Sequence, residues 1–234
     1  MVIISIFKII FGDNMATKKT SIAVILSGCG HLDGAEIHEA TLTLLAIHRL
    51  GAEFQCYAPD KKQFHVVNHL NGEEMEEERN ILVESARIAR GNVVDLATYS
   101  PDNHDALIIP GGFGAAKNLS TFAFDGPHCE VDPDVKNAVL LTHQAQKPIG
   151  ALCIAPVILA KLVKNATVTI GTDTQIAEGI TKMGGKHSET GHGEIVIDRE
   201  NQLVTTPCYM LDSRVDHIAD GAENLVKEIL SMVV

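Results

Sequence analysis

The chain has 234 residues, of which 45% are hydrophobic and 21% are charged, a composition typical of a globular protein with the length of one large α/β domain. Its formal charge is −11, and its basic residues form no stripe that would bind a phosphate backbone or an anionic membrane. No stretch reaches the roughly 20 apolar residues that a membrane span requires. We therefore expect neither nucleic acid nor a membrane as a partner.

The N-terminal segment differs from the rest of the chain. Residues 1–14 are strongly apolar and precede a second methionine, Met15. They lack the charged front end and the small-residue cleavage site of a signal peptide, so we interpret them as an extension upstream of the true start or as a small docking strand. The predicted organisation is an N-terminal extension, residues 1–18, followed by a single domain, residues 19–234.

From residue 21 onward, short apolar runs alternate with longer stretches of helical period. This alternation is typical of βαβ units around a mostly parallel sheet, and the β-branched and leucine content of the runs suits burial on both faces. The predicted strands are residues 22–26, 53–57, 106–109, 148–152, 167–170, 194–197 and 203–206.

Three helices are predicted between and after these strands. The first spans residues 36–50, where Ile37, Ala40, Leu44 and Ile47 share one face. An acidic run, residues 72–78, is expected to open the second, because carboxylates in a first turn complement the helix dipole. The third runs from about residue 212 to the C-terminus and repeats apolar residues at helical spacing, which predicts that it covers one side of the sheet.

The cysteines constrain the compartment and the chemistry. Their number is odd, and they are widely separated without a Cys-x-x-Cys pair, which argues against a disulfide framework and against a zinc site. A reducing cytoplasm fits this pattern best. The five are Cys29, Cys56, Cys129, Cys153 and Cys208.

Cys153 stands between a buried-strand pattern and a helix pattern that carries Pro156 in its first turn. This order is typical of a nucleophile elbow, although the flanking positions that usually hold glycine hold Ala151 and Ala155. A thiol at a helix N-terminus gains thiolate character, because unpaired N–H groups and the helix dipole favour negative charge there. We therefore expect a reactive cysteine; the alternative is an inert buried one.

A glycine-rich turn follows the predicted strand 106–109. Ligands of open α/β sheets collect beyond the carboxyl ends of the strands, so this turn and Cys153 should face the same crevice. The backbone N–H groups there are candidate oxyanion donors, from Gly111, Gly112 and Ile154. The turn is not a P-loop, because no Gly-Lys-Ser/Thr sequence follows it.

The loop after the first strand places Glu36 where its carboxyl could reach a thiol in the crevice and act as a general acid or base. The alternative is a first-turn glutamate that stabilises its helix. Gly28 and Gly30 resemble part of a dinucleotide fingerprint, but Asp33 occupies the third glycine position, and no recognised metal-ligand spacing is present. We expect no dinucleotide and no metal. Three further candidates to line the crevice are Cys29, Gly30 and Asn118.

Several long motifs, in the same order, resemble the ElbB family, which is named for enhancing lycopene biosynthesis and described as a glyoxalase. That family belongs to the PfpI-like branch of the class I glutamine amidotransferase-like superfamily. The resemblance runs from about Lys19 to the end of the chain. Its motifs are Ser27-Gly-Cys-Gly, Asp33-Gly-Ala-Glu-Ile-His-Glu-Ala, Ile109-Pro-Gly-Gly-Phe-Gly-Ala-Ala-Lys-Asn-Leu, Cys153-Ile-Ala-Pro and Thr205-Thr-Pro-x-Tyr-Met-Leu.

The resemblance implies a flavodoxin-like three-layer sandwich, with Cys153 as nucleophile and Glu36 as its hydrogen-bonded carboxylic partner. It implies a homo-oligomer, a dimer or larger, that needs no metal, glutathione or other cofactor. In glyoxalase III-type chemistry the thiolate adds to the aldehyde of methylglyoxal or glyoxal, and a general acid/base then moves a proton between adjacent carbons to give lactate or glycolate.

One departure from the superfamily pattern narrows the alternatives. Protease-like members carry a histidine directly after the nucleophile, where this chain has Ile154, and residues 205–211 supply no His and Glu pair of the kind amidotransferases use. A cysteine amidase or hydrolase would need another base near Cys153. A non-catalytic redox sensor or accessory protein is the alternative outside enzymes. Cys29 is a second redox candidate or a lining residue.

Overall fold

The computed structural model describes residues 19–233, so the predicted extension, residues 1–18, lies outside the described residues. A seven-stranded sheet with the order β3-β2-β1-β4-β5-β9-β8 forms the centre. All neighbouring strands are parallel except β8 and β9. This is the predicted flavodoxin-like architecture. The strands are β1 Ser21–Ile25, β2 Glu53–Ala58, β3 Val93–Asp95, β4 Ala106–Ile109, β5 Ile149–Leu152, β8 Val196–Asp198 and β9 Leu203–Thr206.

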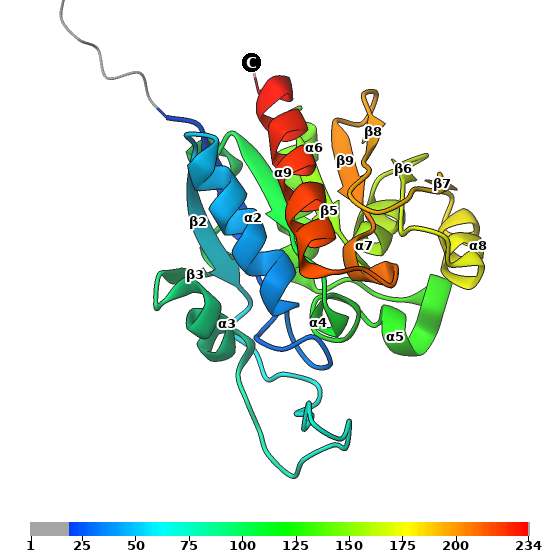
Figure 1. Ribbon diagram of the computed structural model, residues 1–234. Coiled ribbons are helices and arrows are strands. Elements are labelled where there is room, and N and C mark those ends of the chain that lie inside the picture. Colours follow the sequence, from blue (N-terminus) through cyan, green and yellow to red (C-terminus); the bar gives the residue numbers. More distant parts are fainter. Residues whose placement is uncertain (1–18, 234) are drawn as a thin grey trace, which may run out of the picture.

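Helices cover both faces of the sheet (Figure 1). Helices α2 (Ile37–Arg49) and α9 (Val215–Met232) lie side by side on one face, while α6 (Pro133–Gln144) and α7 (Pro156–Leu162) lie on the other. The two faces follow from the strand order, because right-handed crossovers that move in opposite directions from the sheet centre put their helices on opposite sides. In residues 19–233 no helix has both the length and the apolar character to cross a bilayer.

The remaining elements are short. The helices are α3 Ile81–Ala89, α4 Phe113–Lys117, α5 Phe122–Asp125 and α8 Thr174–Lys182, and the 3-10 turns are η1 Leu96–Thr98, η2 Pro101–Asn103, η3 Gly126–His128 and η4 Cys208–Met210. A separate two-stranded sheet pairs β6 (Thr167–Val168) with β7 (Lys186–His187). The predicted strand 167–170 is therefore shorter than expected and lies outside the main sheet.

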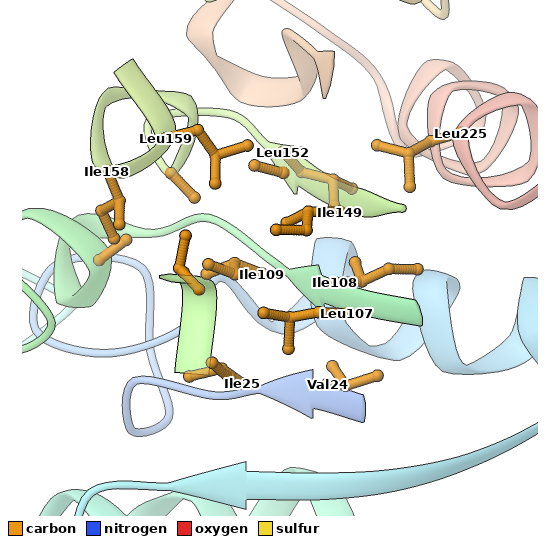
Figure 2. Packing of buried hydrophobic residues seen from close by; sticks show 14 of the residues in the cluster. Val24, Ile25, Leu107, Ile108, Ile109, Ile149, Leu152, Ile158, Leu159 and Leu225 are labelled. Carbon is orange, nitrogen blue, oxygen red and sulfur yellow. The ribbon is translucent and has the colours of Figure 1, made fainter. Parts of the chain in front are cut away.

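The core lies between the central strands and the helices on either side, and Figure 2 shows it from close by. Strands β4 and β5 are buried along their whole length, as parallel strands covered on both faces must be. Gly150 lets α9 approach β5 closely, since a Cβ there would lie 2.8 Å from Leu225 Cδ2. The close approach fixes α9, and with it the neighbouring α2, against the strands that carry the site.

The prediction that residues 72–78 open a helix is wrong. This acidic run belongs to a long loop, residues 59–80, and the helix that follows begins only at Ile81. The Asn80 side chain caps that helix by accepting a hydrogen bond of 3.0 Å from the Val83 N–H. Acidic residues of the run instead pair with cations of the same loop, as Glu78 does with Lys62. The run has too few apolar residues to hold a helix against the sheet.

Candidate active site

Three loops leave the carboxyl ends of the neighbouring strands β1, β4 and β5 and meet at one edge of the sheet. Together with residues of α2, α8 and η4, they line a cavity of about 620 Å³. The structure thus brings the Cys153 elbow and the glycine-rich turn to one crevice, as strand-end geometry predicts. The lining residues are His31, Glu36, His38, Gly112, Phe113, Cys153, Ile154, Asp173, Ile176, Tyr209 and Met210.

Cys153 occupies the sharp turn between β5 and α7. Its φ is +59°, a left-handed conformation that costs a non-glycine residue free energy and that surrounding contacts must maintain. One such contact is the hydrogen bond of 2.9 Å from its own N–H to the carbonyl oxygen of Thr206 on β9. Only 7% of the residue is exposed, although it lines the cavity. This is the geometry of a nucleophile elbow.

Two backbone N–H groups, from Gly112 and Ile154, donate hydrogen bonds to the Cys153 sulfur. Gly112 must be glycine, because its φ is +99° and a Cβ there would lie 2.4 Å from the Glu36 nitrogen and from the Gly34 oxygen. Both donors predicted for an oxyanion therefore surround the reacting atom. The third, Gly111, has another partner: its N–H donates to a carboxylate oxygen of Glu39 at 3.0 Å.

The carboxyl that hydrogen-bonds Cys153 belongs to Glu39 and not to Glu36. Glu36 is the N-cap of α2, and its Oε2 accepts a 2.7 Å hydrogen bond from the Glu39 N–H. The structure therefore corrects the partner that the family resemblance implied. Glu36 instead has the other role that the sequence allowed: its side chain stabilises helix α2 as a cap. The same side chain also lines the cavity.

Glu39 is completely buried, and this determines its protonation. Its two oxygens accept hydrogen bonds from the N–H of Gly111 at 3.0 Å and of Tyr209 at 3.3 Å, which favour the charged form. Burial first, and then the nearby Glu36 charge, outweigh them and raise the pKa of Glu39 from 4.5 to about 8. At neutral pH the Glu39 side chain is therefore largely a neutral carboxylic acid that can donate a proton.

Burial is also the largest influence on the pKa of the Cys153 thiol. Together with the charge of Glu39 it raises the pKa of Cys153 well above 9.0, while the N–H groups of Gly112 and Ile154 lower it. This corrects the expectation of a ready thiolate, because exclusion of water outweighs the helix end. Loss of one proton leaves a single negative charge on the pair. When sulfur carries it, protonated Glu39 and both N–H groups can donate to it.

Other residues that the sequence did not single out as catalytic complete the cavity. His38 Nδ1 lies 2.8 Å from the Tyr209 hydroxyl and 3.9 Å from Glu36 Oε1, so the three form a polar group on the cavity wall. Asp173 contributes a second carboxylate from the N-cap of α8. The apolar surface comes from Phe113, Ile154, Ile176 and Met210.

The three remaining candidates lie outside this lining. Asn118 holds the loops together, since its Nδ2 donates to the carbonyl oxygens of Ser27 at 2.9 Å and Asp33 at 2.8 Å. Gly30 is packed against His69, whose Nε2 would lie 2.6 Å from an added Cβ. Cys29 is half-buried, and burial raises its pKa. Within residues 19–233 no three His, Cys, Asp or Glu side chains are arranged to hold a metal ion.

Comparison with known proteins places the chain in a family, although no family model matches it. A rat protein named ES1 protein homolog, mitochondrial, is 47% identical over 224 residues, which cover 92% of this chain and 84% of the rat protein. The chain belongs to the ES1 family. A human protein named glutamine amidotransferase-like class 1 domain-containing protein 3, mitochondrial, is also 47% identical, over 221 residues that cover 90% of this chain and 82% of the human one.

Solved structures agree with this assignment. A crystal structure from Ehrlichia chaffeensis, described as an isoprenoid biosynthesis protein with amidotransferase-like domain, superposes on this ES1-family chain with a TM-score of 0.86 at 40% identity, covering 92% of this chain and all of that one. Glyoxalase III from Candida albicans shares the fold, with a TM-score of 0.59 at 15% identity over 92% of this chain and 98% of that one. The predicted superfamily is thus confirmed.

The predicted cytoplasmic location is contradicted. The rat, human and zebrafish relatives are all named mitochondrial, the zebrafish ES1 protein being 35% identical over 232 residues. These names point to mitochondria. The prediction rested on five unpaired cysteines, a pattern that does not distinguish one reducing compartment from another.

Proposed function

We propose that this ES1-family chain is a glutathione-independent glyoxalase that converts small α-oxoaldehydes to hydroxy acids, with Cys153 as nucleophile and Glu39 as proton carrier. The observation that carries the proposal is the contact between the Cys153 sulfur and a buried carboxyl whose pKa is raised to about 8. A carboxyl that titrates near neutral pH can give a proton in one step and take one in the next.

The first step is addition of the thiol to the aldehyde carbon of methylglyoxal. A sulfur–carbon bond forms, the carbonyl π bond breaks, and the aldehyde oxygen takes a proton from Glu39, giving a hemithioacetal. The pair enters this step with one proton, which Glu39 holds while the sulfur is a thiolate, so giving that proton to the aldehyde oxygen leaves Glu39 as a carboxylate that is then available as a base. The N–H groups of Gly112 and Ile154 stabilise negative charge at this position throughout.

The second step moves a proton between adjacent carbons. The base takes the hydrogen from the sulfur-bearing carbon, an enediol forms, and the proton returns to the neighbouring carbon, which leaves a thioester of lactate. Water cleaves the thioester, releasing lactate and the thiol. One carbon is oxidised while its neighbour is reduced, so the reaction consumes one water and needs no external oxidant.

Two observations favour this proposal over the alternatives. Redox-sensing cysteines are exposed and have low pKa values, whereas Cys153 is 7% exposed and its pKa is raised. A Cys–His hydrolase needs an imidazole at the thiol, whereas the hydrogen-bond partners of Cys153 are a carboxyl and backbone N–H groups. The predicted homo-oligomer and the likeness to the ElbB family in particular remain expectations.

The test is turnover of methylglyoxal by the purified chain without glutathione, with lactate measured as product. Cys153→Ala should abolish lactate formation. Cys29→Ala is the matched control, because Cys29 is the half-buried cysteine outside the cavity lining, and this variant should keep wild-type turnover. Equal lactate formation by wild type and Cys153→Ala would exclude the mechanism.

A further inference from the structure

The cavity in front of Cys153 is much larger than the substrate considered so far. Methylglyoxal has five non-hydrogen atoms, whereas a cavity of about 620 Å³ is in the range that encloses a drug-sized ligand. Its apolar wall includes Phe113, Ile176 and Met210. Aromatic and thioether side chains favour an aromatic or aliphatic body, which would displace water from this wall.

The charged groups of the cavity lining are carboxylates, beside the imidazoles of His31 and His38. Glu36 and Asp173 contribute carboxylates, and among the described residues that line the cavity there is no lysine and no arginine. Lys117 approaches the Phe113 ring, since its Nζ lies 5.2 Å from the ring centre and donates a 3.0 Å hydrogen bond to the Leu32 carbonyl oxygen. Lys117 itself is not a lining residue.

Both carboxylates also occupy helix N-caps. Glu36 accepts from the Glu39 N–H in α2, and Asp173 accepts from the Ile176 N–H at 2.9 Å in α8. A helix N-terminus attracts anions when its N–H groups are free. Here a fixed carboxylate already accepts from one N–H at each helix end and places a negative charge there, which disfavours the carboxylate of a ligand.

We infer that this cavity selects α-oxoaldehydes with an uncharged, apolar body and rejects those that carry a carboxylate. The inference rests on the proposed function for the reacting aldehyde, while the selection itself follows from the size and charge of the cavity.

Three substrates test the effects of substrate size and substrate charge separately: methylglyoxal, phenylglyoxal and 4-carboxyphenylglyoxal. We expect kcat/KM for phenylglyoxal to exceed that for methylglyoxal by about tenfold, because the ring fills the apolar wall. The kcat/KM of the carboxylated analogue should be at least about tenfold below that of phenylglyoxal, because the carboxylates of Glu36 and Asp173 repel its charge in a cavity that is partly shielded from solvent. Equal values for phenylglyoxal and its carboxylated analogue would overturn the inference.

A charge-neutral variant isolates the electrostatic part. Asp173→Asn keeps a good N-cap acceptor and removes one charge from the cavity, so it should raise the relative rate of the carboxylated probe several-fold. Asp95→Asn is the matched control, since Asp95 caps η1 in the same way and does not line the cavity. A change in the probe ratio as large in the control as in Asp173→Asn would overturn the inference.

Alkylation of Cys153 tests the selection without any turnover. Iodoacetamide and iodoacetate both form a sulfur–carbon bond with loss of iodide and differ in charge. Relative to 2-mercaptoethanol, Cys153 should prefer the neutral reagent by at least about tenfold, and Asp173→Asn should reduce that preference. Preference without turnover of any glyoxal would support the selection and refute the glyoxalase. Turnover without preference would refute the selection and leave the glyoxalase standing.

Discussion

Replacing Glu39 by glutamine removes an ionisable group from the protein interior, and the consequence depends on pH. The folded state holds the Glu39 proton with a pKa of about 8, whereas an ordinary glutamate has a value of 4.5. Below 4.5 both folded and unfolded states carry the proton. Between these values only the folded state does, so wild-type stability falls as pH rises, and above about 8 the loss is complete.

The size of this effect follows from linkage. Stability falls by about 1.4 kcal/mol per pH unit in this interval, which gives roughly 5 kcal/mol over its full width. Glu39→Gln should lack this contribution. It also loses one acceptor for the N–H of Gly111 or Tyr209, which lowers its stability by a constant amount. The pH dependence of the stability difference therefore reports on the buried carboxyl, whereas the lost hydrogen-bond acceptor contributes only a constant difference.

Urea denaturation of both proteins at several pH values between 5.5 and 7.5 measures the difference directly. We expect the free energy of unfolding of Glu39→Gln, relative to wild type, to rise by roughly 3 kcal/mol across this range. Glu223→Gln is the control, because Lys227 lowers the pKa of Glu223, and its removal should give no such rise. A constant difference between Glu39→Gln and wild type would refute the conclusion that Glu39 is buried as a neutral acid.

The remaining predictions concern two glycines. Gly111→Ala should abolish activity and lower the melting temperature by several degrees, because its Cβ would lie 2.3 Å from Cys153 Cβ and 2.5 Å from Glu39 Oε2; activity and thermal unfolding report both effects. Gly179→Ala should stabilise the protein by about 0.5–1 kcal/mol, since helix α8 gains a better helix former and the new Cβ meets neighbours no closer than 3.6 Å. Loss of stability in Gly179→Ala, or full activity in Gly111→Ala, would contradict these contacts.

The fold could be predicted because its signals are local. Strands β4 and β9 have the predicted bounds, since four consecutive buried residues stand out between polar loops. Strands β3 and β7 were not predicted, because runs of three and two residues carry no measurable period. The helix predicted to open at the acidic run, residues 72–78, was wrong because the charges suited a helix end, whereas the pairing of Glu78 with Lys62 in the same loop depends on the folded geometry.

The candidate site was only partly predictable. Cys153 and Gly112 could be placed because both follow strands, but the choice between Glu36 and Glu39 depended on the buried face of α2. The sequence suggested a face that includes Ile37, yet Ile37 is 46% exposed. The other three residues of that face, Ala40, Leu44 and Ile47, are buried as predicted. The buried face also contains the polar Glu39 and Thr43, which a search for apolar period does not reveal.

Protonation could not be predicted at all from the sequence. The expected thiolate relied on the helix end next to Cys153, which is a local feature. Exclusion of water depends instead on how deeply the folded chain buries the thiol and Glu39, which only the folded structure determines.

The most direct test of the account compares two variants that differ from wild type by the same chemical change. Initial rates of methylglyoxal conversion should fall at least about 100-fold in Glu39→Gln, because the proton carrier is lost. The rate of Glu36→Gln should stay within about tenfold of wild type, because Glu36 caps α2 and does not hydrogen-bond the thiol. The reverse order, with Glu36→Gln inactive and Glu39→Gln active, would contradict the assignment of Glu39 as the partner of Cys153.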